Sequence, residues 1–336
     1  MLVPMRAILD AADKNDYAQG AFNVNAVCQA KAVINVHEMF RSPAILQGAD
    51  LANGFMGGRT DFANATLEDK KAGAKNIAAA VKKYGTDSRI PIALHLDHGR
   101  NMDSCIAAIE GGYTSVMIDG SSLPFDENVE LTREVVKYAH ERGVVVEAEL
   151  GTLAGVEDEV KVSHENSSYT RPEDVQEFVE RTGCDSLAIA IGTSHGAYKF
   201  TPAQCTRNEK GILVPPPLRF DILEEVSRRL PGFPIVLHGS SSVPQEYVKM
   251  INEYGGKMPD AIGIPEEQLR KAASMSVCKI NIDSDLRLAM TGTIRKHFVE
   301  HPADFDPRTY LKPARENIKQ LVKHKIIDVL GCNDKA

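Results

Sequence analysis

The chain has 336 residues, 43% of them hydrophobic and 25% charged, which is the composition of a globular protein with a substantial core. A formal net charge of -7 without a long block of Lys and Arg disfavours nucleic acid and anionic membranes as main partners. Six scattered cysteines form no C-x-x-C pair, no apolar run has transmembrane length, and no secretory signal is recognisable. We therefore expect a cytoplasmic enzyme.

Apolar, β-branched segments alternate with helical stretches, a pattern typical of βαβ units and a parallel sheet. Eight segments have the composition of strands: residues 20–26, 43–49, 91–98, 115–121, 144–151, 186–193, 234–240 and 277–284. Eight such strands predict an α/β fold, a (β/α)8 TIM barrel spanning residues 1–336 as one domain, with a C-terminal helical extension at about 300–336. A doubly wound sheet is the alternative, but no G-x-G-x-x-G follows the first strand.

Two predicted helices have recognisable ends. Residues 126–142 offer Asp126 as the N-cap and have a glycine just past the last turn. Residues 172–182 begin with Pro172 in the first turn and also stop before a glycine. Both helices are expected to lead directly into strands.

Two connections are too long for a bare βα unit: residues 151–171 after the fifth strand and residues 194–233 after the sixth. The first combines glycines with several acids. A mobile lid would bring Glu157, Asp158 or Glu159 over a site and exclude water. A solvated acidic loop is the alternative interpretation.

Active sites of such barrels lie at the C-terminal ends of the strands. Three histidines, His98, His195 and His238, fall at predicted strand ends, and a glycine that permits close backbone approach follows each. Three neutral imidazoles with an open fourth position suit a catalytic divalent metal, and zinc is the metal that this ligand set favours most. One such histidine alone is more often structural, but three at the same rim favour the metal site.

Acids accompany these histidines. Asp97 is placed to act as a general acid or base beside a metal, although a fourth ligand or a turn cap would also explain it. Asp119 and Glu149 are predicted to orient the imidazoles or to form a second metal position. His95 is expected to be buried within its strand. The other histidines are expected to be solvated: His37, His140, His164, His297, His301 and His324.

The loops after the seventh and eighth strands commonly bind phosphate in these barrels. Here they read HGSSS (238–242) and NIDSD (281–285), and their small residues expose backbone N–H groups that form anion-binding nests. Lys199 and Arg287 would add positive charge, the arginine in bidentate fashion. Plain Ser/Gly loops and solvated cations are the alternatives.

The segments HLDHG, VMIDGSSLPFDENV, VEAELGTLAGVEDEV, AIGTSHGAYKF, VLHGSSSVP, KMPDAIGIP and VCKINIDSDLRLAMTGTIRKHF together resemble class II fructose-1,6-bisphosphate aldolase, the metal-dependent kind. The resemblance runs over nearly the whole chain, from GAFNVN to HPADFDPRTYL. It implies a TIM barrel, usually a homodimer, that reversibly cleaves fructose 1,6-bisphosphate into dihydroxyacetone phosphate and glyceraldehyde 3-phosphate through a metal-stabilised enediolate. This is a reaction of glycolysis and gluconeogenesis.

The resemblance also implies a role for each matching residue. His98, His195 and His238 match the ligands of one catalytic zinc ion. Asp97 matches the catalytic acid or base, and Glu157 matches the lid glutamate that moves a proton at the nucleophilic carbon. The positions that hold dihydroxyacetone phosphate match Gly196, Lys199, Gly239, Ser241, Asn281, Asp283 and Ser284.

Further positions follow from the same resemblance. Arg287 and Arg308 resemble residues that reach the other phosphate, Arg308 in the neighbouring subunit. Asp119 and Glu149 resemble the acids near a secondary metal position, and a monovalent cation, Na+ or K+, is a further cofactor to test. The lid departs from the family pattern, because Ala154 stands where one of two consecutive glycines is common.

Other functions remain open from the residues alone. A Schiff-base aldolase would use Lys279, in the eighth predicted strand, as its nucleophile. A tagatose-1,6-bisphosphate aldolase would share the machinery, with Asp283 as the residue that discriminates between the sugars. A metal-dependent hydrolase and a non-catalytic sugar-phosphate-binding protein are more remote alternatives.

Overall fold

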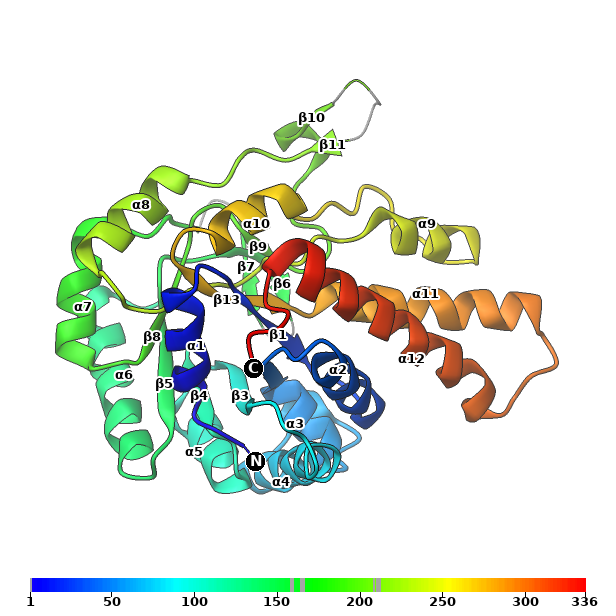
Figure 1. The fold of residues 1–336 in the computed structure, drawn as a ribbon, viewed down its shortest axis with the longest axis horizontal. Helices are drawn as coiled ribbons and strands as arrows, with labels where there is room; N and C mark the ends of the chain where they lie inside the picture. Colours follow the sequence, from blue (N-terminus) through cyan, green and yellow to red (C-terminus); the bar gives the residue numbers. More distant parts are fainter. Residues whose placement is uncertain (1, 158–159, 164–166, 208, 210–212) are drawn as a thin grey trace.

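A computed structural model describes residues 2–157, 160–163, 167–207, 209 and 213–336. Its centre is a closed barrel of parallel strands in which each strand lies next to its successor in the chain, as predicted (Figure 1). The barrel strands are β1 (Gln19–Asn23), β2 (Ala44–Ala49), β3 (Ile92–Gly99), β4 (Ser115–Ile118), β5 (Val145–Leu150), β8 (Ser186–Ile189), β12 (Ile235–Leu237) and β13 (Val277–Ile282). Each falls within or at the edge of a segment that the sequence marks as a strand.

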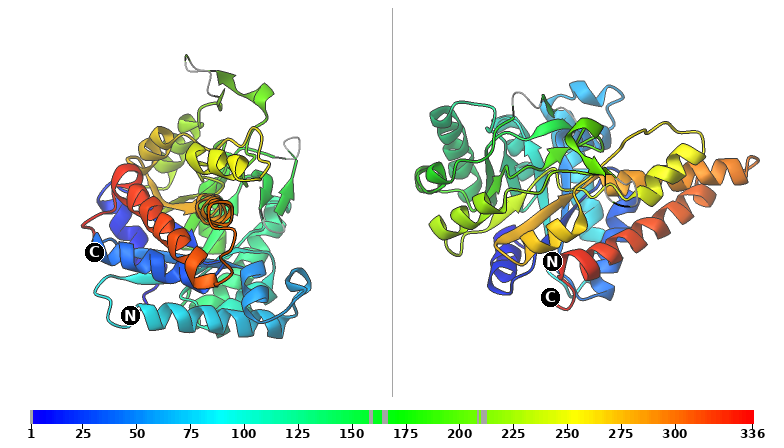
Figure 2. Two further views of the ribbon diagram at one scale, coloured as in Figure 1. Left: turned by 90° about the vertical axis from the view of Figure 1, so that its right-hand side faces the viewer. Right: turned by 90° about the horizontal axis from the view of Figure 1, so that it is seen from above.

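The main apolar core lies between the barrel strands and the helices around them. Most of the helices cover the outside of the barrel, and others near the C-terminus extend away from it (Figures 1 and 2). The helices are α1 (Met5–Lys14), α2 (Val27–Met39), α3 (Asp50–Met56), α4 (Leu67–Tyr84), α5 (Met102–Gly111), α6 (Phe125–His140), α7 (Val175–Thr182), α8 (Phe220–Arg229), α9 (Gln245–Glu253), α10 (Glu266–Ala273), α11 (Ser284–Glu300) and α12 (Pro307–His324). No helix among the described residues combines the length and the apolar character that crossing a bilayer requires.

The helix ends differ slightly from the predicted ones. Helix α6 begins at Phe125 with Pro124 in the cap position, so the assignment of Asp126 as N-cap is wrong. The carboxylate of Asp126 lies instead in the first turn, where it favours the helix dipole. The next predicted helix starts with a 3-10 turn at Pro172–Asp174 before α7, and ends at a left-handed Gly183 as expected.

The long connection after β5 contains regular structure. Its strands β6 (Ala154–Glu157) and β7 (Val160–Val162) form an antiparallel hairpin, and β6 also pairs with β9 (Ser194–His195). The connection after β8 carries β9 and a second small hairpin, β10 (Thr206–Arg207) with β11 (Leu213–Val214). The first insertion is therefore joined to the second at the mouth of the barrel.

The C-terminal extension is helical, as predicted. Helices α11 and α12 lie side by side and project away from the barrel (Figures 1 and 2). Helix α12 returns to the barrel and ends in a π-helical segment, η5 (Lys325–Leu330). A buried π-helical turn is uncommon, and such turns often occur at functional sites.

Candidate active site and metal centre

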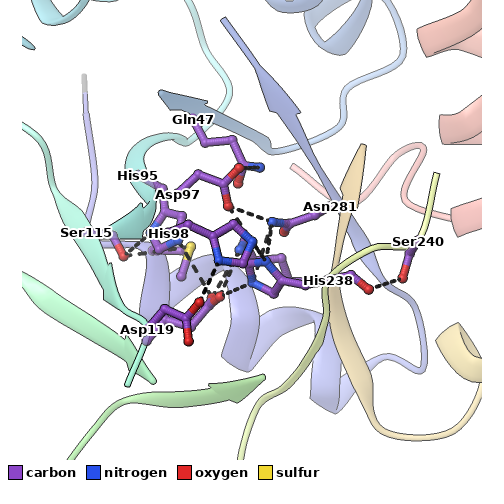
Figure 3. A network of polar contacts seen from close by, with 12 residues as sticks. Gln47, His95, Asp97, His98, Ser115, Asp119, His238, Ser240 and Asn281 are labelled. Carbon is purple, nitrogen blue, oxygen red and sulfur yellow. Dashed lines mark hydrogen bonds and ion pairs between the residues drawn. The ribbon is translucent and has the colours of Figure 1, made fainter. Parts of the chain in front are cut away.

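Two consecutive residues of β3, Asp97 and His98, both reach the mouth of the barrel (Figure 3). Side chains of a regular strand alternate between its two faces, so one of this pair would normally point outward. Here the register with β4 shifts between Leu96 and Gly99, and His98 has a left-handed φ of 49°. Such a backbone costs about 1–3 kcal/mol, and strained residues of this kind tend to cluster at functional sites.

The three predicted ligand histidines meet at this point. His98 comes from β3, His195 from β9 and His238 from the residue after β12. The ring centroids of His98 lie 4.8 Å from those of His195 and 4.5 Å from those of His238. All three side chains are buried, and their candidate ligand nitrogens lie within 4.8 Å of one another.

Carboxylates orient two of the rings. Asp119 Oδ2 lies 3.3 Å from His98 Nδ1, and Glu147 Oε1 lies 2.6 Å from His238 Nε2. The remaining nitrogens, His98 Nε2 and His238 Nδ1, face each other at 2.9 Å. The two rings therefore turn different nitrogens toward the shared centre, each held by an acceptor on its far side.

Burial controls the protonation of these rings. It lowers the pKa of His195 and of His238 well below the usual value, with the positive charge of His98 acting in the same direction. Burial also opposes a charge on His98, but the hydrogen bond with Asp119 and the charges of nearby carboxylates raise its pKa to about 10. Burial, together with the charge of Asp119, raises the pKa of Glu149.

A divalent cation fits this donor set. Three buried imidazoles, two of them favoured in the neutral form, are the ligand set of catalytic zinc sites with an open coordination position. The metal would take the place of the proton on His98, since ligation and protonation compete for one lone pair. His98, Asp119 and Glu149 form a second group whose ligand atoms also lie within 4.8 Å.

Asp97 is held by three side-chain amides from other strands. Its Oδ2 accepts hydrogen bonds from Asn23 Nδ2 at 2.8 Å and from Gln47 Nε2 at 3.0 Å, while its Oδ1 accepts from Asn281 Nδ2 at 2.9 Å. In the described part of the chain, the buried oxygens Gln47 Oε1 and Asn281 Oδ1 have no hydrogen-bond partner. They remain able to accept from a ligand hydroxyl.

The residues predicted to hold phosphate come together beside Asn281. Ser241 and Ser284 are buried, and Ser241 Oγ accepts from the backbone N–H of Asp283 at 3.3 Å. Asp283 Oδ1 accepts from Asn25 Nδ2 at 2.8 Å, and its Oδ2 lies 2.5 Å from an Arg287 nitrogen. Helix α11 begins here, so its N-terminal turn and Arg287 supply positive potential to this corner.

Lys199 and Gly239 both contact Ser194 in β9. Lys199 is buried and donates to the Ser194 carbonyl at 2.5 Å. A Cβ on Gly239 would lie 2.7 Å from the backbone of Ser194, and Gly239 has a φ of 60°. The space that this glycine leaves is therefore filled by the backbone of Ser194, which is the close backbone approach that the sequence predicts.

A cavity of about 300 Å³ opens beside the histidines. His195, Asp119, Glu149 and Thr152 line it, together with Arg100, which the sequence argument did not select. A larger hollow of about 1050 Å³ lies between the β10–β11 hairpin, α9 and α12, and its lining contains none of the three histidines. The smaller cavity is therefore the one that borders the histidine cluster, through His195.

Other predicted residues lie apart from this cluster or outside what the structure describes. Arg308 is 91% exposed, pairs with Asp306 at 2.6 Å and starts α12 at the end far from the barrel. The backbone of Glu157 lies in β6, and its side chain is outside the description. The alternative lid acids, residues 158–159, and His164 lie outside the described residues.

The remaining histidines differ in how deeply they are buried. His95 is buried as expected, with Nδ1 2.8 Å from Ser115 Oγ. His37 is fully buried on α2, so its prediction as a solvated residue is wrong. The His297 side chain is only 12% exposed, which also contradicts that prediction, whereas those of His140 and His324 are each 44% exposed. His301 is exposed as predicted.

Fold and site together define the chain as a (β/α)8-barrel protein with a three-histidine site at the carboxyl ends of its strands. The family model described as fructose-bisphosphate aldolase class-II matches residues 3–335. The chain belongs to this family, and it is therefore an aldolase, a carbon–carbon lyase.

Individual relatives agree with this assignment. A fructose-bisphosphate aldolase of Treponema pallidum is 54% identical over 100% of this chain and 98% of its own length. One from Giardia intestinalis is 47% identical over 97% of this chain and 92% of its own. Among solved structures, the YdjI aldolase of Escherichia coli K12 superposes with a TM-score of 0.74 at 28% identity over the whole of both chains.

Proposed function

We propose that the chain catalyses the zinc-dependent, reversible cleavage of D-fructose 1,6-bisphosphate into dihydroxyacetone phosphate and D-glyceraldehyde 3-phosphate. One observation carries this proposal: three buried imidazoles converge within 4.8 Å beside Asp97, next to a corner lined by Ser241, Asp283 and Arg287. The curated relatives above bear the matching name. A metal centre, an acid–base group and an anion site are the three parts that such a cleavage needs.

In this proposal each residue has a defined task. When bound to His98, His195 and His238, zinc supplies a Lewis acid that stabilises the negative charge left as the carbon–carbon bond breaks. Asp97, fixed by its three amide donors, takes the proton from the C4 hydroxyl in cleavage and returns it in condensation. Glu157 moves the proton at the nucleophilic carbon.

Phosphate binding aligns the substrate with the metal. Seven residues are proposed to hold the dihydroxyacetone phosphate half: Gly196, Lys199, Gly239, Ser241, Asn281, Asp283 and Ser284. Arg287 is proposed to reach the second phosphate, with Arg308 from a neighbouring subunit. Binding energy gained at these remote groups places the reacting bond beside Asp97.

The Schiff-base alternative has little support from the geometry. Lys279 is fully buried and ion-paired with Glu147, so a substrate carbonyl has no access to its amine. Asp119 and Glu149, with His98, are proposed as a secondary metal position.

A coupled cleavage assay tests the proposal. Treatment with EDTA is expected to abolish cleavage of fructose 1,6-bisphosphate, and added Zn2+ to restore it, without trapping by borohydride. Asp97→Asn is expected to lose about a hundredfold or more in kcat. Asp103→Asn, exposed on the following helix, is the matched control with unchanged rate. Full activity after metal removal, or an unchanged rate in Asp97→Asn, would overturn the proposal.

Substrate preference and assembly need separate measurements. We expect a higher kcat/KM for fructose than for tagatose 1,6-bisphosphate, and a reversed ratio would assign the chain to the tagatose-specific enzymes. A homodimer in the cytoplasm is proposed, with the exposed Arg308 serving the partner site. Sedimentation velocity checks the dimer, and rates in Na+, K+ and a bulky organic cation check the monovalent-ion requirement.

A further inference from the structure

The loop after β12 is tied to the first turn of α11 by a single carboxylate. Asp285 Oδ1 accepts the backbone N–H of Val243 at 2.8 Å, and Oδ2 accepts the N–H of Ser242 at 3.1 Å. Val243 has a φ of 50°, a conformation that a β-branched residue rarely adopts without support. Asp285 therefore sets the shape of the turn that follows Ser241.

A lysine from the far end of the chain completes this arrangement. Lys325, the first residue of η5, is fully buried, and its Nζ lies 2.9 Å from Asp285 Oδ2 and 2.7 Å from Glu266 Oε1. It also donates to Ser242 Oγ at 2.6 Å. One ammonium thus joins the C-terminal segment, the start of α10, the start of α11 and the loop after β12.

The charges explain why a lysine is buried there. A carboxylate beneath an anion-binding corner repels phosphate, and a buried carboxylate is costly unless it is paired. Lys325 offsets the charge of Asp285 and gives it a fixed position, so the carboxylate can hold the turn. His324, the residue before Lys325, has its Nε2 2.8 Å from Glu266 Oε2 and so fixes the second acid of the cluster.

We propose that Lys325 is a positioning residue for the phosphate site: through Asp285 and Ser242 it holds the loop after β12 in the shape that accepts a phosphate monoester. This inference rests on the proposed function of Ser241 and the neighbouring backbone. In this proposal the C-terminal segment contributes to substrate binding through Lys325, although Lys325 itself does not contact the substrate.

Lys325→Met removes the ammonium and keeps most of the side-chain volume. We expect two constants to rise about tenfold each: KM for fructose 1,6-bisphosphate and the competitive inhibition constant of inorganic phosphate. A tenfold rise corresponds to the loss of roughly one charge-assisted hydrogen bond. The kcat and the zinc affinity are expected to stay within about twofold, since the metal ligands are untouched. Lys323→Met, exposed in the last turn of α12, is the matched control without effect.

Two further variants separate positioning from general damage. Lys325→Arg keeps the charge and is expected to recover most of the phosphate affinity. Asp285→Asn combined with Lys325→Met removes both members of the fully buried pair, while Glu266 keeps His324 as a partner. This double variant is expected to bind phosphate more tightly than Lys325→Met alone. If Lys325→Met does not accumulate as folded protein, Lys325→Gln takes its place with the same expected changes.

The proposal is overturned if phosphate inhibition and KM stay at wild-type values, or if kcat, zinc affinity and KM all deteriorate together. Equal losses in the single and double variants would also overturn the role of charge compensation. Ser241→Ala provides the separate test of the phosphate site. If the wild-type enzyme is insensitive to phosphate and Ser241→Ala leaves KM unchanged, the proposed site fails, whatever Lys325 does.

Discussion

The ammonium of Lys279 lies 3.1 Å from each carboxylate oxygen of Glu147, and both side chains are completely buried inside the barrel. Glu147 Oε1 in turn lies 2.6 Å from His238 Nε2. The carboxylate accepts a hydrogen bond from His238 Nε2–H, and this leaves Nδ1 as the nitrogen that faces His98. Lys279, the lysine considered as a Schiff-base nucleophile, therefore pairs with the carboxylate that orients His238.

Glu147→Gln is expected to weaken zinc binding by about ten- to a hundredfold. The amide keeps the size of the side chain but can present an N–H to His238, which would favour the wrong tautomer. Competition with a fluorescent chelator measures the affinity independently of turnover. Glu177→Gln, an exposed change on α7, is the control, and equal zinc affinity in the two variants would contradict the proposed support.

Lys279→Met is expected to destabilise the metal-free protein by about 3–5 kcal/mol, because it leaves Glu147 buried without its cation. The double variant with Glu147→Gln removes both charges and is expected to recover much of this loss. Urea unfolding of the single and double variants gives the free energies of unfolding. If the two single losses simply add, the pair makes no favourable coupling and the prediction is wrong.

Gln47→Leu tests the amides that hold Asp97. The change removes a hydrogen bond of 3.0 Å to the carboxylate, and such a bond to a charged group contributes about 1.5–3 kcal/mol. We expect kcat to fall tenfold or more, at unchanged zinc affinity, because Asp97, the proposed acid–base group, loses its orientation. Gln176→Leu on the exposed face of α7 is the control. A kcat equal to that of the control would show that Asn23 and Asn281 suffice.

The barrel and its histidines could be predicted from the sequence for a simple physical reason. Parallel strands place their last residues on one rim, so residues far apart in the chain, such as His98 and His238, could be assigned to the same end of the barrel. His195 joins His98 and His238 for a different reason. It lies on the separate strand β9, which pairs with β6 outside the barrel sheet. Strand composition gave no signal for that pairing.

The contacts of the side chains that support the site depend on more than the sequence pattern. Asn23, Gln47 and Glu147 lie inside three different strands, and their partners depend on strand register and on which face each residue takes. Alternation even assigns Asp97 and His98 to opposite faces, and only the left-handed backbone at His98 brings both to the mouth. A search for polar residues at inward positions of buried strands would have found the amides.

The burial of His37 has a consequence for stability against acid. Helix α2 packs this ring edge-on against Phe22, with Nδ1 3.2 Å from Ser42 Oγ. Burial lowers its pKa from the usual 6.5 to about 4. Between these two pH values the unfolded chain binds a proton that the folded protein does not, so the free energy of unfolding falls as the pH falls.

We expect this group to contribute a loss of up to about 1.4 kcal/mol per pH unit below pH 6.5, ending near pH 4. His37→Gln removes the titration, so its free energy of unfolding is expected to depend less steeply on pH, even where the substitution lowers stability overall. Urea unfolding at pH 7.5, 6.0 and 5.0 gives the slopes, with the exposed His301→Gln as control. The prediction concerns the slope of the free energy of unfolding against pH and not its absolute value. Parallel pH curves for wild type and His37→Gln would therefore contradict it.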